Sequence, residues 1–276
     1  MPSNSSLANN VTIITGASTG IGEELAYQLA KEGAHLVLAS RRVDELERVA
    51  ARVRALGARA AVVACDVAIE KDCKHLMDFT VAEFGGIDTI VLNAGMTMWA
   101  KFADIKDMAI VERIMQVNFM GAVYCTHHAL PHLTKSRGRI VGVASLTGLV
   151  GVPTRTAYAA SKHAMRGFFD SLRIELGGSG VTVTMIYPGF VATGIRENAT
   201  GADGKAAKVD PVNKDEVMSV EECGSIMVRA IASRQREVVM TLKGKLGQWL
   251  KLIAPSVIDR MAKRAVEGNQ KYVESK

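Results

Sequence analysis

Short apolar segments alternate with amphipathic ones along most of this chain, and the alternation constrains the fold more than any other feature. Six apolar runs have the composition of strands, and they lie at residues 11–15, 35–40, 60–64, 88–92, 139–144 and 181–186. Each run is continuously apolar, as expected when helices cover both faces of a parallel sheet. Connections between parallel strands are right-handed almost without exception. The pattern therefore predicts an α/β fold, a doubly wound parallel sheet in a three-layer α/β/α arrangement.

Between these runs, apolar residues recur at helical spacing and predict helices at 20–31, 43–56, 69–84, 111–133 and from Tyr158 to about Leu176. Gly57 has the position of a residue that closes the second helix. Further on, Ser219 and Glu222 resemble a capping box that opens another helix. Residues 238–241 have the composition of a final edge strand.

At 276 residues and 48% hydrophobic composition, the chain is large enough for one sizeable core, and neither a linker nor an internal repeat divides it. We expect a flexible polar segment at 1–10, a single folded domain at 11–242 and an amphipathic helical extension at 243–276. Residues 193–215 are rich in Gly, Ala, Asn and Lys and lack periodicity. They predict a mobile loop over the site, and a disordered surface loop fits the composition equally well.

The net charge of +6 and the pI near 9.2 would suit nucleic acid or an anionic membrane surface. The basic residues are spread along the chain, however, and aromatic residues make up only 5% of it. No stretch interleaves basic with aromatic residues as a base-stacking surface would. Nucleic acid is therefore not expected as a partner.

Cysteines and histidines show no metal-binding pattern. The cysteines lack ligand-like spacing and indicate free thiols in a reducing compartment; they are Cys65, Cys73, Cys125 and Cys223. One predicted helix carries His127, His128 and His132 without an accompanying set of cysteines or carboxylates, so surface or packing roles are expected and a metal site is not. No secretory signal or membrane-spanning run is visible, which predicts a soluble, cytoplasmic protein.

A glycine-rich turn, Thr15-Gly-Ala-Ser-Thr-Gly-Ile-Gly22, joins the first predicted strand to the first helix. Its glycines permit a tight turn and a close approach of the backbone to a pyrophosphate at the helix N-terminus. The spacing G-x-x-x-G-x-G differs from the GxGxxG of other dinucleotide-binding folds. Its place between strand and helix favours a binding turn over a purely structural one. The candidate cofactor contacts here are Gly16, Ser18, Thr19, Gly20, Ile21 and Gly22.

The second predicted strand ends in Ser40, Arg41 and Arg42. Folds that bind NAD usually carry an acid here for the ribose 2′-hydroxyl. An arginine can instead pair with a 2′-phosphate through two hydrogen bonds. We interpret Arg41, with Ser40 and Arg42, as a preference for NADP(H) over NAD(H). The alternative is that both arginines are solvated residues at the start of the next helix, paired with Asp44 or Glu45.

Tyr158 and Lys162 are four residues apart on a predicted helix, and Ser145 precedes the tyrosine by thirteen. The four-residue spacing puts both side chains on one helix face. A free tyrosine has a pKa of about 10, so it becomes a usable base only when a cation favours its phenolate. A hydroxyl from Ser145 could meet the same substrate oxygen. The three residues suit proton transfer to or from a carbonyl or alcohol, with a hydride carrier bound at the glycine turn.

Together these residues resemble the short-chain dehydrogenase/reductase family in its compact form of one Rossmann-like domain, over roughly residues 11–240. The glycine turn is similar to the family's TGxxxGxG motif. The catalytic tetrad of the family is matched, at intervals of 27, 13 and 4 residues, by Asn118, Ser145, Tyr158 and Lys162. Other segments resemble the family's cofactor contacts, and they contain Asp66, Val67, Asn93, Ala94, Gly95, Pro188, Gly189, Val191 and Thr193. The resemblance implies that 11–242 is an NADP(H)-binding catalytic domain.

The resemblance also implies a role for each member of the tetrad. Tyr158 would be the general acid in reduction and the general base in oxidation. Lys162 would lower the pKa of the tyrosine and bond to the nicotinamide ribose. Ser145 would donate a hydrogen bond to the substrate oxygen, and Asn118 would hold a water between Lys162 and solvent. Elsewhere, Asp66 would contact the adenine and Thr193 the nicotinamide carboxamide.

These residues predict an NADP-dependent oxidoreductase that acts on a small-molecule carbonyl or secondary alcohol. Two other functions stay open. A sugar-nucleotide epimerase can also use a Tyr-Lys pair with a bound cofactor, but its relatives usually have a different glycine spacing and a longer C-terminal domain. A catalytically silent dinucleotide-binding or sensor protein is the other, and the complete tetrad argues against it.

The substrate is predicted to be hydrophobic, because apolar residues follow the strand ends where ligands bind in such sheets. These residues are Met96, Met98, Trp99, Leu146, Leu149, Val150, Val152 and Phe190. They indicate a steroid-like, aromatic or long-chain compound. The alternative is that they are ordinary residues that anchor loops.

Beyond the sixth strand, lysines and arginines surround an apolar stripe that Pro255 interrupts. The stripe consists of Leu246, Trp249, Leu250, Ile253, Val257, Ile258 and Met261. The favoured interpretation is a helix packed on the domain or on a partner subunit. The alternative is a helical pair that shields an apolar pocket or rests peripherally on an anionic membrane. The family resemblance further implies a homodimer or homotetramer built from the helices at 111–133 and 158–176.

Overall fold

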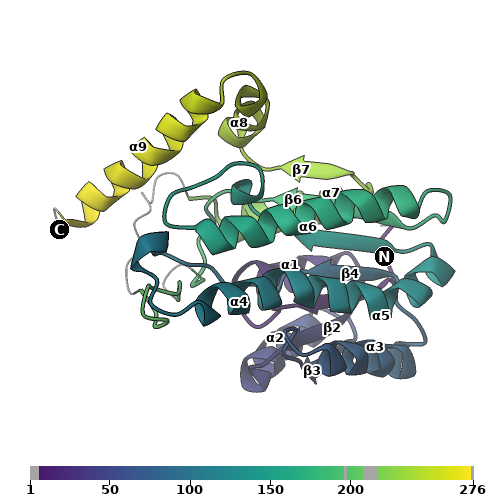
Figure 1. Cartoon of the computed structure of the whole chain (residues 1–276). Helices are drawn as coiled ribbons and strands as arrows, with labels where there is room; N and C mark the ends of the chain where they lie inside the picture. Colours follow the sequence, from purple (N-terminus) through teal and green to yellow (C-terminus); the bar gives the residue numbers. More distant parts are fainter. Residues whose placement is uncertain (1–5, 196–197, 208–216, 275–276) are drawn as a thin grey trace.

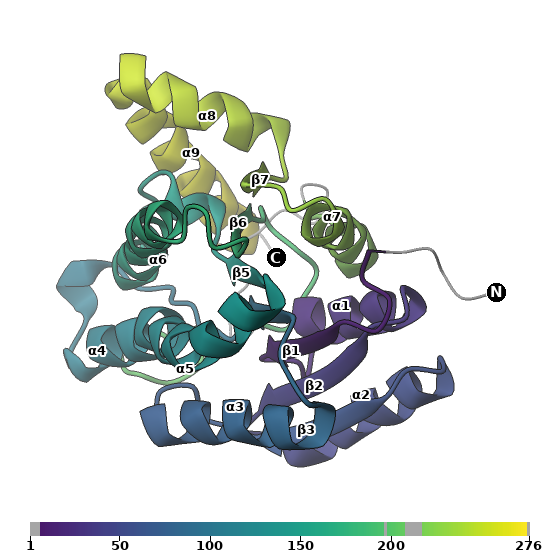
Figure 2. The same cartoon turned by 90° about the vertical axis from the view of Figure 1, so that its right-hand side faces the viewer.

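A parallel sheet of seven strands forms the centre of the molecule, in the order β3-β2-β1-β4-β5-β6-β7. The computed structural model describes residues 6–195, 198–207 and 217–274. Figures 1 and 2 show the sheet between two layers of helices. The strands are β1 (Val11–Thr15), β2 (His35–Ser40), β3 (Ala60–Ala64), β4 (Thr89–Leu92), β5 (Arg139–Val143), β6 (Thr182–Tyr187) and β7 (Glu237–Val239).

The predicted fold class, a doubly wound three-layer sheet in a single domain, is confirmed. The first three apolar runs coincide with β1, β2 and β3. The next two differ from β4 and β5 by one residue at one end, and the sixth is shifted from β6 by one residue. All of these strands pair in parallel. From β1 the chain winds outward to β3 and then returns to β4 on the other side of β1. The carboxyl ends of β1 and β4 therefore flank the point where the winding reverses, which is where such sheets bind ligands.

Helices cover each face of the sheet and bury their apolar stripes against it. One face is covered by α1 (Gly20–Lys31), α2 (Val43–Ala55) and α7 (Val220–Ala232), and the other by α3 (Glu70–Phe84), α4 (Ala109–Met115), α5 (Gly121–Ser136) and α6 (Thr156–Glu175). Each layer encloses its own core, with Leu25 and Leu46 in the first and Leu76 and Phe169 in the second. Short helical turns lie at η1 (Phe102–Asp104) and η3 (Leu146–Gly148).

Two of the predicted helix ends are confirmed at atomic detail. The backbone N–H of Glu222 donates to the Ser219 hydroxyl at 3.1 Å, which caps the start of α7. Gly57 follows α2 with φ +89°, the left-handed conformation that closes a helix.

The helix predicted at 111–133 is confirmed as a continuous helical stretch, but it contains a π-turn that the sequence did not predict. The chain forms α4, then a π-helical turn over Gln116–Met120 (η2), and then α5. The turn contains Asn118, whose side-chain amide bonds to the backbone of Met96, and a π-turn re-aims a side chain without ending the helix. The apolar periodicity of the sequence continues through the π-turn, so the periodicity did not reveal the turn.

The segment predicted to be flexible at 1–10 is packed over its second half. Leu7 is fully buried, and the Asn9 N–H donates to the Gly33 carbonyl at 2.9 Å. Residues 1–5 lie outside the described residues, as do 196–197 and 208–216 of the predicted mobile loop. The described part of that loop is tied to the chain after β4, because the Trp99 N–H donates to the Thr200 carbonyl at 3.0 Å.

Two helices, α8 (Leu242–Ile253) and α9 (Pro255–Glu274), follow β7 and form the predicted extension. Pro255 opens α9, so the proline separates two helices as its place in the apolar stripe suggests. In Figure 1 the pair extends from the edge of the domain beyond β7 toward the side on which the loop after β6 lies.

Candidate active site

The turn between β1 and α1 requires glycine at Gly16, Gly20 and Gly22. Gly16 and Gly20 have φ of +66° and +62°, a region that L-residues with a Cβ seldom adopt. A Cβ on Gly16 would lie 2.8 Å from the Cα of Ala94. One on Gly22 would lie 2.6 Å from the Asn93 side-chain nitrogen. The turn therefore packs directly on the chain after β4 and leaves its backbone at the N-terminus of α1.

Asn93 and Thr15 hold this turn in place. The Asn93 side chain donates to the carbonyl oxygens of Thr15 at 3.0 Å and Gly16 at 3.1 Å. The Thr15 hydroxyl in turn accepts from the backbone N–H groups of Asn93 and Ala94. Two of the segments that the sequence marks as cofactor contacts are thus brought together at the point where the winding reverses.

The arginines after β2 lie beside the glycine turn. The Arg42 guanidinium donates to the hydroxyl oxygens of Ser18 at 2.9 Å and Thr19 at 3.0 Å. Arg41 is largely exposed, and its guanidinium is 3.8 Å from the Asp66 carboxylate. The sequence analysis favours Arg41 over Arg42 as the contact of a 2′-phosphate, but Arg42 is the arginine that reaches the glycine turn.

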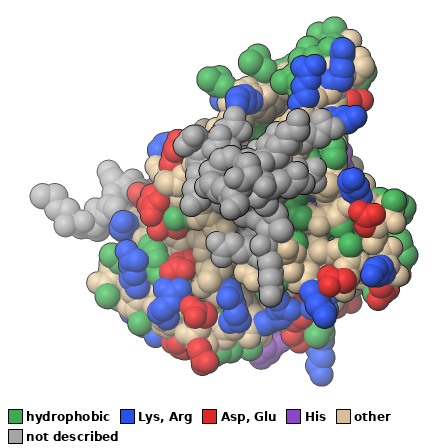
Figure 3. All heavy atoms as spheres, turned by 90° about the vertical axis from the view of Figure 1, so that its left-hand side faces the viewer, with side chains coloured by type: hydrophobic (Ala, Val, Ile, Leu, Met, Phe, Trp, Pro, Cys, Tyr) green, Lys and Arg blue, Asp and Glu red, His purple; other side chains and the backbone are tan. Residues whose placement is uncertain are grey.

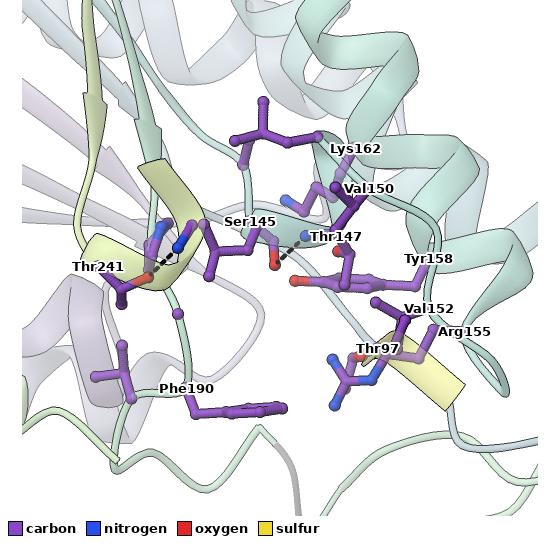
Figure 4. Close-up of a pocket in the computed structure, with 18 of the residues that line it drawn as sticks. Thr97, Ser145, Thr147, Val150, Val152, Arg155, Tyr158, Lys162, Phe190 and Thr241 are labelled. Atoms are coloured by element: carbon purple, nitrogen blue, oxygen red, sulfur yellow. Dashed lines mark hydrogen bonds between the residues drawn. The ribbon is translucent and has the colours of Figure 1, made fainter. Parts of the chain in front are cut away.

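Tyr158 and Ser145 meet at the carboxyl end of β5. Ser145 follows β5 and caps η3, accepting from the Thr147 N–H at 3.3 Å. Burial raises the pKa of Tyr158, while the positive charge of Arg155 and a hydrogen bond with Ser145 act to lower it. Figure 4 shows the tyrosine hydroxyl pointing toward Ser145. The two predicted oxygen-binding hydroxyls thus lie side by side.

Lys162 lies one turn after Tyr158 on α6 and is buried. Its ammonium donates to the Val143 carbonyl at 2.9 Å and lies 5.8 Å from the centre of the Tyr158 ring. Burial lowers the pKa of the lysine to about 8. The side chain is therefore fixed at the end of β5, and its effect on the acidity of Tyr158 stays a prediction.

Asn118 is fully engaged by its neighbours. Its side chain accepts from the Met96 N–H at 2.8 Å and donates to the Met96 carbonyl and to the Ser161 hydroxyl, each at 2.9 Å. These bonds join the π-turn to the chain after β4 and to α6. The structure thus shows a residue that locks three elements together, and the water relay expected of it stays a prediction.

The segment after β6 runs back toward the glycine turn. The Pro188 carbonyl accepts from the Leu146 N–H at 3.0 Å, and Val191 pairs with Met218 in an isolated bridge. A Cβ on Gly20 would lie 3.0 Å from the Thr193 methyl group. Pro188, Gly189, Val191 and Thr193 therefore lie between the hydroxyls of Ser145 and Tyr158 and the glycine turn, and their contact with the cofactor stays a prediction.

One cavity of about 950 Å³ is lined by the residues after β5, by those after β6 and by residues beside the glycine turn. Ser145, Tyr158 and Lys162 line it on one side, and it reaches Asn93 and Thr193 beside the glycine turn. Most of the remaining wall is apolar (Figure 4). Its size and apolar lining suit a drug-sized or larger organic molecule next to the catalytic hydroxyls.

Six of the eight residues predicted to bind the substrate line this cavity: Trp99, Leu146, Leu149, Val150, Val152 and Phe190. Met96 and Met98 are absent from its lining. Met98 is fully buried in a small separate cluster with Ile110 and Ile114, and Met96 packs against that cluster. The prediction is therefore wrong for these two methionines, because their strand-end loop turns them toward α4.

Sequence reasoning missed one wall of the cavity. Leu242, Gly244, Gly247, Ile258 and Met261 line it from α8 and α9. The Lys251 ammonium donates to the Leu149 carbonyl at 2.9 Å and ties α8 to the loop after β5. The pair of glycines three residues apart was the available signal, since Gly244 lets α8 approach Leu146 and Gly247 faces Ile258 of α9. The alternative in which a helical pair shields an apolar pocket matches this geometry.

The outer face of the same helices is apolar and exposed. Its large side chains are 66–84% exposed, and they are Leu246, Trp249, Leu252 and Ile253. Figure 3 shows apolar and basic side chains mixed at this end of the molecule. Packing on the domain buries Ile258 and leaves these side chains uncovered in the single chain, so a partner subunit or a membrane as their cover stays a prediction.

A family model described as short chain dehydrogenase matches residues 10–204. The chain belongs to this family. Short-chain dehydrogenases are oxidoreductases that use a nicotinamide dinucleotide. Within the described residues of this short-chain dehydrogenase, no helix is both long and apolar enough to span a bilayer.

Among curated proteins, this short-chain dehydrogenase is similar to several with hydroxysteroid dehydrogenase names. The 11-beta-hydroxysteroid dehydrogenase-like 4A of Arabidopsis thaliana is 42% identical over 255 residues, covering 92% of this chain and 84% of that protein. The 11-beta-hydroxysteroid dehydrogenase 1A of the same plant is 37% identical, covering 92% and 74%. The dehydrogenase/reductase SDR family protein 7-like of Dictyostelium discoideum is 35% identical, covering 92% and 81%.

Proposed function

We propose that this protein transfers a hydride between NADP(H) and an apolar ketone or secondary alcohol, with Tyr158 as the general acid and base. One observation carries the proposal. The hydroxyl groups of Ser145 and Tyr158 lie together in an apolar cavity that also holds Lys162 and reaches the glycine turn. A substrate oxygen placed between the two hydroxyls would face both a hydrogen-bond donor and a proton carrier.

Each residue has a defined task in this proposal. A nicotinamide dinucleotide bound at the glycine turn would supply or accept the hydride. In reduction, the Tyr158 hydroxyl gives its proton to the substrate oxygen, and in oxidation the phenolate takes the proton of the alcohol. Ser145 donates a hydrogen bond to the same oxygen as negative charge grows there. Lys162 lies one turn away and adds positive charge whenever it is protonated.

The preference for NADP(H) is supported by the surroundings of the Ser18 and Thr19 hydroxyls. Arg42 donates to both of them, and Arg41 follows the same strand. Two guanidinium groups and two hydroxyls suit a doubly charged phosphate monoester. An acid, Asp66, lies 3.8 Å from Arg41.

We propose a large, rigid, apolar substrate of steroid-like size. The cavity volume of about 950 Å³ and the side chains of Trp99 and Phe190 in its wall support this class. The hydroxysteroid dehydrogenase names of the relatives point the same way. A homodimer or homotetramer through α5 and α6 is the assembly that the family suggests, and light scattering of the purified protein tests it.

The deciding experiment is a panel of ketones and secondary alcohols, followed by the absorbance of NADPH and NADH. Turnover of apolar substrates with NADPH, lost in Tyr158→Phe while NADPH still binds, is the expected result. A Tyr158→Phe variant with full turnover would remove the proton carrier from the proposal. Turnover with NADH alone would overturn the cofactor preference.

The exposed face of α8 supports a second proposal, that this end of the protein rests on an anionic membrane surface. Residues 242–276 contain eight Lys and Arg against three Asp and Glu, which leaves +5 of the chain's net charge of +6 in this extension. Two such surfaces would repel each other across a dimer interface, whereas anionic lipid attracts both the bases and the exposed Trp249. The substrate cavity lies directly behind the same helices.

A further inference from the structure

Arg155 is a buried cation in the wall of the active-site cavity that sequence reasoning passed over. It is the residue before α6, where its carbonyl accepts from the Ala159 N–H at 2.8 Å. Tyr158 follows three residues later and Lys162 four residues after that. Because a helix turns every 3.6 residues, the two basic residues lie about one turn before and one turn after the tyrosine, on the same face.

The distances place the two cations about equally far from the tyrosine. The Arg155 guanidinium carbon is 5.6 Å from the centre of the Tyr158 ring, and the Lys162 ammonium is 5.8 Å from it. The guanidinium stacks on the Trp99 ring at 3.6 Å and lies 5.6 Å from the Phe190 ring. In Figure 4, Arg155 lies on the side of the tyrosine that faces Phe190. Stacking of this kind holds a guanidinium in one orientation.

The described part of the cavity wall carries further charged side chains. The charged side chains among the described residues that line the cavity are all basic: Arg155, Lys162, Lys243 and Arg264. The last two come from the exposed parts of α8 and α9. Lys162 is buried with a pKa of about 8, so it loses its charge as the solution becomes basic. An arginine stays charged at every pH at which a tyrosine titrates.

We propose that Arg155 is a positioning residue for Tyr158, a second and permanent cation that favours the phenolate form of the general base. The inference rests on the proposed role of Tyr158 as the proton carrier. It is consistent with the direction in which the Arg155 charge moves the pKa of Tyr158, which is downward, against the larger raising effect of burial. The guanidinium would let the enzyme keep a usable base when Lys162 is neutral.

The test measures the titration of the Tyr158 phenol directly and needs no assay of enzyme activity. A fluorinated tyrosine is incorporated at position 158, because fluorine is small and makes the phenol titrate below the pH at which proteins unfold. Fluorine NMR then gives the midpoint in the natural sequence, in Arg155→Lys and in Arg155→Met. We expect the midpoint of Arg155→Met to rise by about one to two pH units, the size of a unit charge about 6 Å away at an effective dielectric constant of about 20. Arg155→Lys should retain most of the lower midpoint.

An unchanged midpoint in a folded Arg155→Met protein would overturn the proposal, even if that protein had lost activity, because the arginine would then serve only the structure or the substrate. If Arg155→Met fails to fold, Arg155→Gln takes its place and the same criterion applies. A second reading uses the natural tyrosine and the oxidation reaction. There the rise of kcat/KM with pH should move to higher pH in the neutral variant and not in Arg155→Lys.

The two proposals fail in different ways. A midpoint that depends on Arg155 in a protein with no turnover on any alcohol or ketone supports the second cation and counts against the oxidoreductase assignment. Turnover that requires Tyr158, with a titration midpoint and a pH profile that do not change in the Arg155 variants, supports the oxidoreductase assignment and refutes the role of Arg155.

Discussion

The ammonium nitrogen of Lys162 lies 2.9 Å from the carbonyl oxygen of Val143, and this bond fixes the lysine at the carboxyl end of β5. Its pKa falls to about 8 because the side chain is buried. The protein therefore keeps, next to its catalytic hydroxyls, a cation that is costly to bury. A residue that lowers stability and is nevertheless placed in an active site is expected to serve the chemistry.

Lys162→Met should stabilise the protein while it abolishes most activity. The unfolded chain holds the lysine proton up to a pKa near 10.5, whereas the folded protein releases it near 8. The natural protein thus bears the full cost of the buried cation below pH 8, and the cost shrinks as the pH rises toward 10.5. The stability advantage of the variant should decrease by about 3 kcal/mol across that range.

Urea unfolding of both proteins at a series of pH values measures this difference. Both proteins carry Tyr158→Phe in this comparison, since Lys162 also acts on the titration of Tyr158, and the buried cysteines that they share then cancel. An advantage that stays constant from pH 7 to 10.5 would show that the lysine keeps its ordinary pKa in the folded protein.

Gly16→Ala should disrupt both folding and nucleotide binding. The new Cβ would lie 2.8 Å from Ala94 in a backbone with φ +66°. Gly57→Ala is a matched control, because Gly57 has φ +89° and open space around it. We expect the control to cost about 1 kcal/mol, from the left-handed backbone alone, and the Gly16 variant to lose at least twice that.

Thermal unfolding and calorimetric titration with NADPH give the two readings for these variants. Equal losses of stability in both would mean that the contact between the glycine turn and Ala94 is easily relieved. Undiminished NADPH binding by Gly16→Ala would count against the turn as the cofactor site.

Arg42→Ala should weaken the use of NADPH without affecting NADH. Losing charge-assisted hydrogen bonds to a phosphate costs about 1.5–3 kcal/mol, or about a 10–100-fold rise in the KM for NADPH. Arg54→Ala is the control, since Arg54 is an exposed arginine of α2 whose guanidinium pairs with Glu47 at 3.2 Å. Steady-state kinetics with both cofactors decide the matter, and parallel rises in both KM values would refute a 2′-phosphate role.

Trp249→Ser combined with Leu246→Ser should release the protein from membranes. These side chains are 66% and 69% exposed on α8. Flotation with vesicles of anionic and of zwitterionic lipid should show the natural protein on the anionic vesicles alone, and the double variant on neither. Ile174→Ser removes an equally exposed side chain from α6 and should change nothing. A natural protein that stays in the soluble fraction with anionic vesicles would rule the membrane proposal out.

The sheet and the catalytic hydroxyls could be predicted because local signals define them. Buried parallel strands are continuously apolar, and the turn after β1 requires glycines at fixed positions, so both features are visible in the sequence itself. The π-turn at Gln116–Met120 could not be predicted in this way. It depends on the two hydrogen bonds between the Asn118 side chain and the backbone of Met96, which is distant in the sequence, and the apolar spacing runs through it unchanged.

The remaining misses have the same physical origin. Leu242 and Met261 line the cavity because α8 and α9 fold back beside the loop after β5, a contact that no periodicity encodes. Met98 points toward α4 because Thr200 pairs with it from a loop about a hundred residues away. Arg155 left a visible signal, its three-residue distance from Tyr158, but that signal acquires meaning only once the stacking on Trp99 fixes the guanidinium.

The division of the cavity wall between α6 and the helical pair α8 and α9 has an evolutionary consequence. In the proposed mechanism, proton transfer depends on residues of α6, and the shape of the cavity that selects the substrate depends on α8 and α9. Mutation can therefore reshape the second without disturbing the first, so descendants of such a protein are free to acquire new substrates while they inherit the reaction intact.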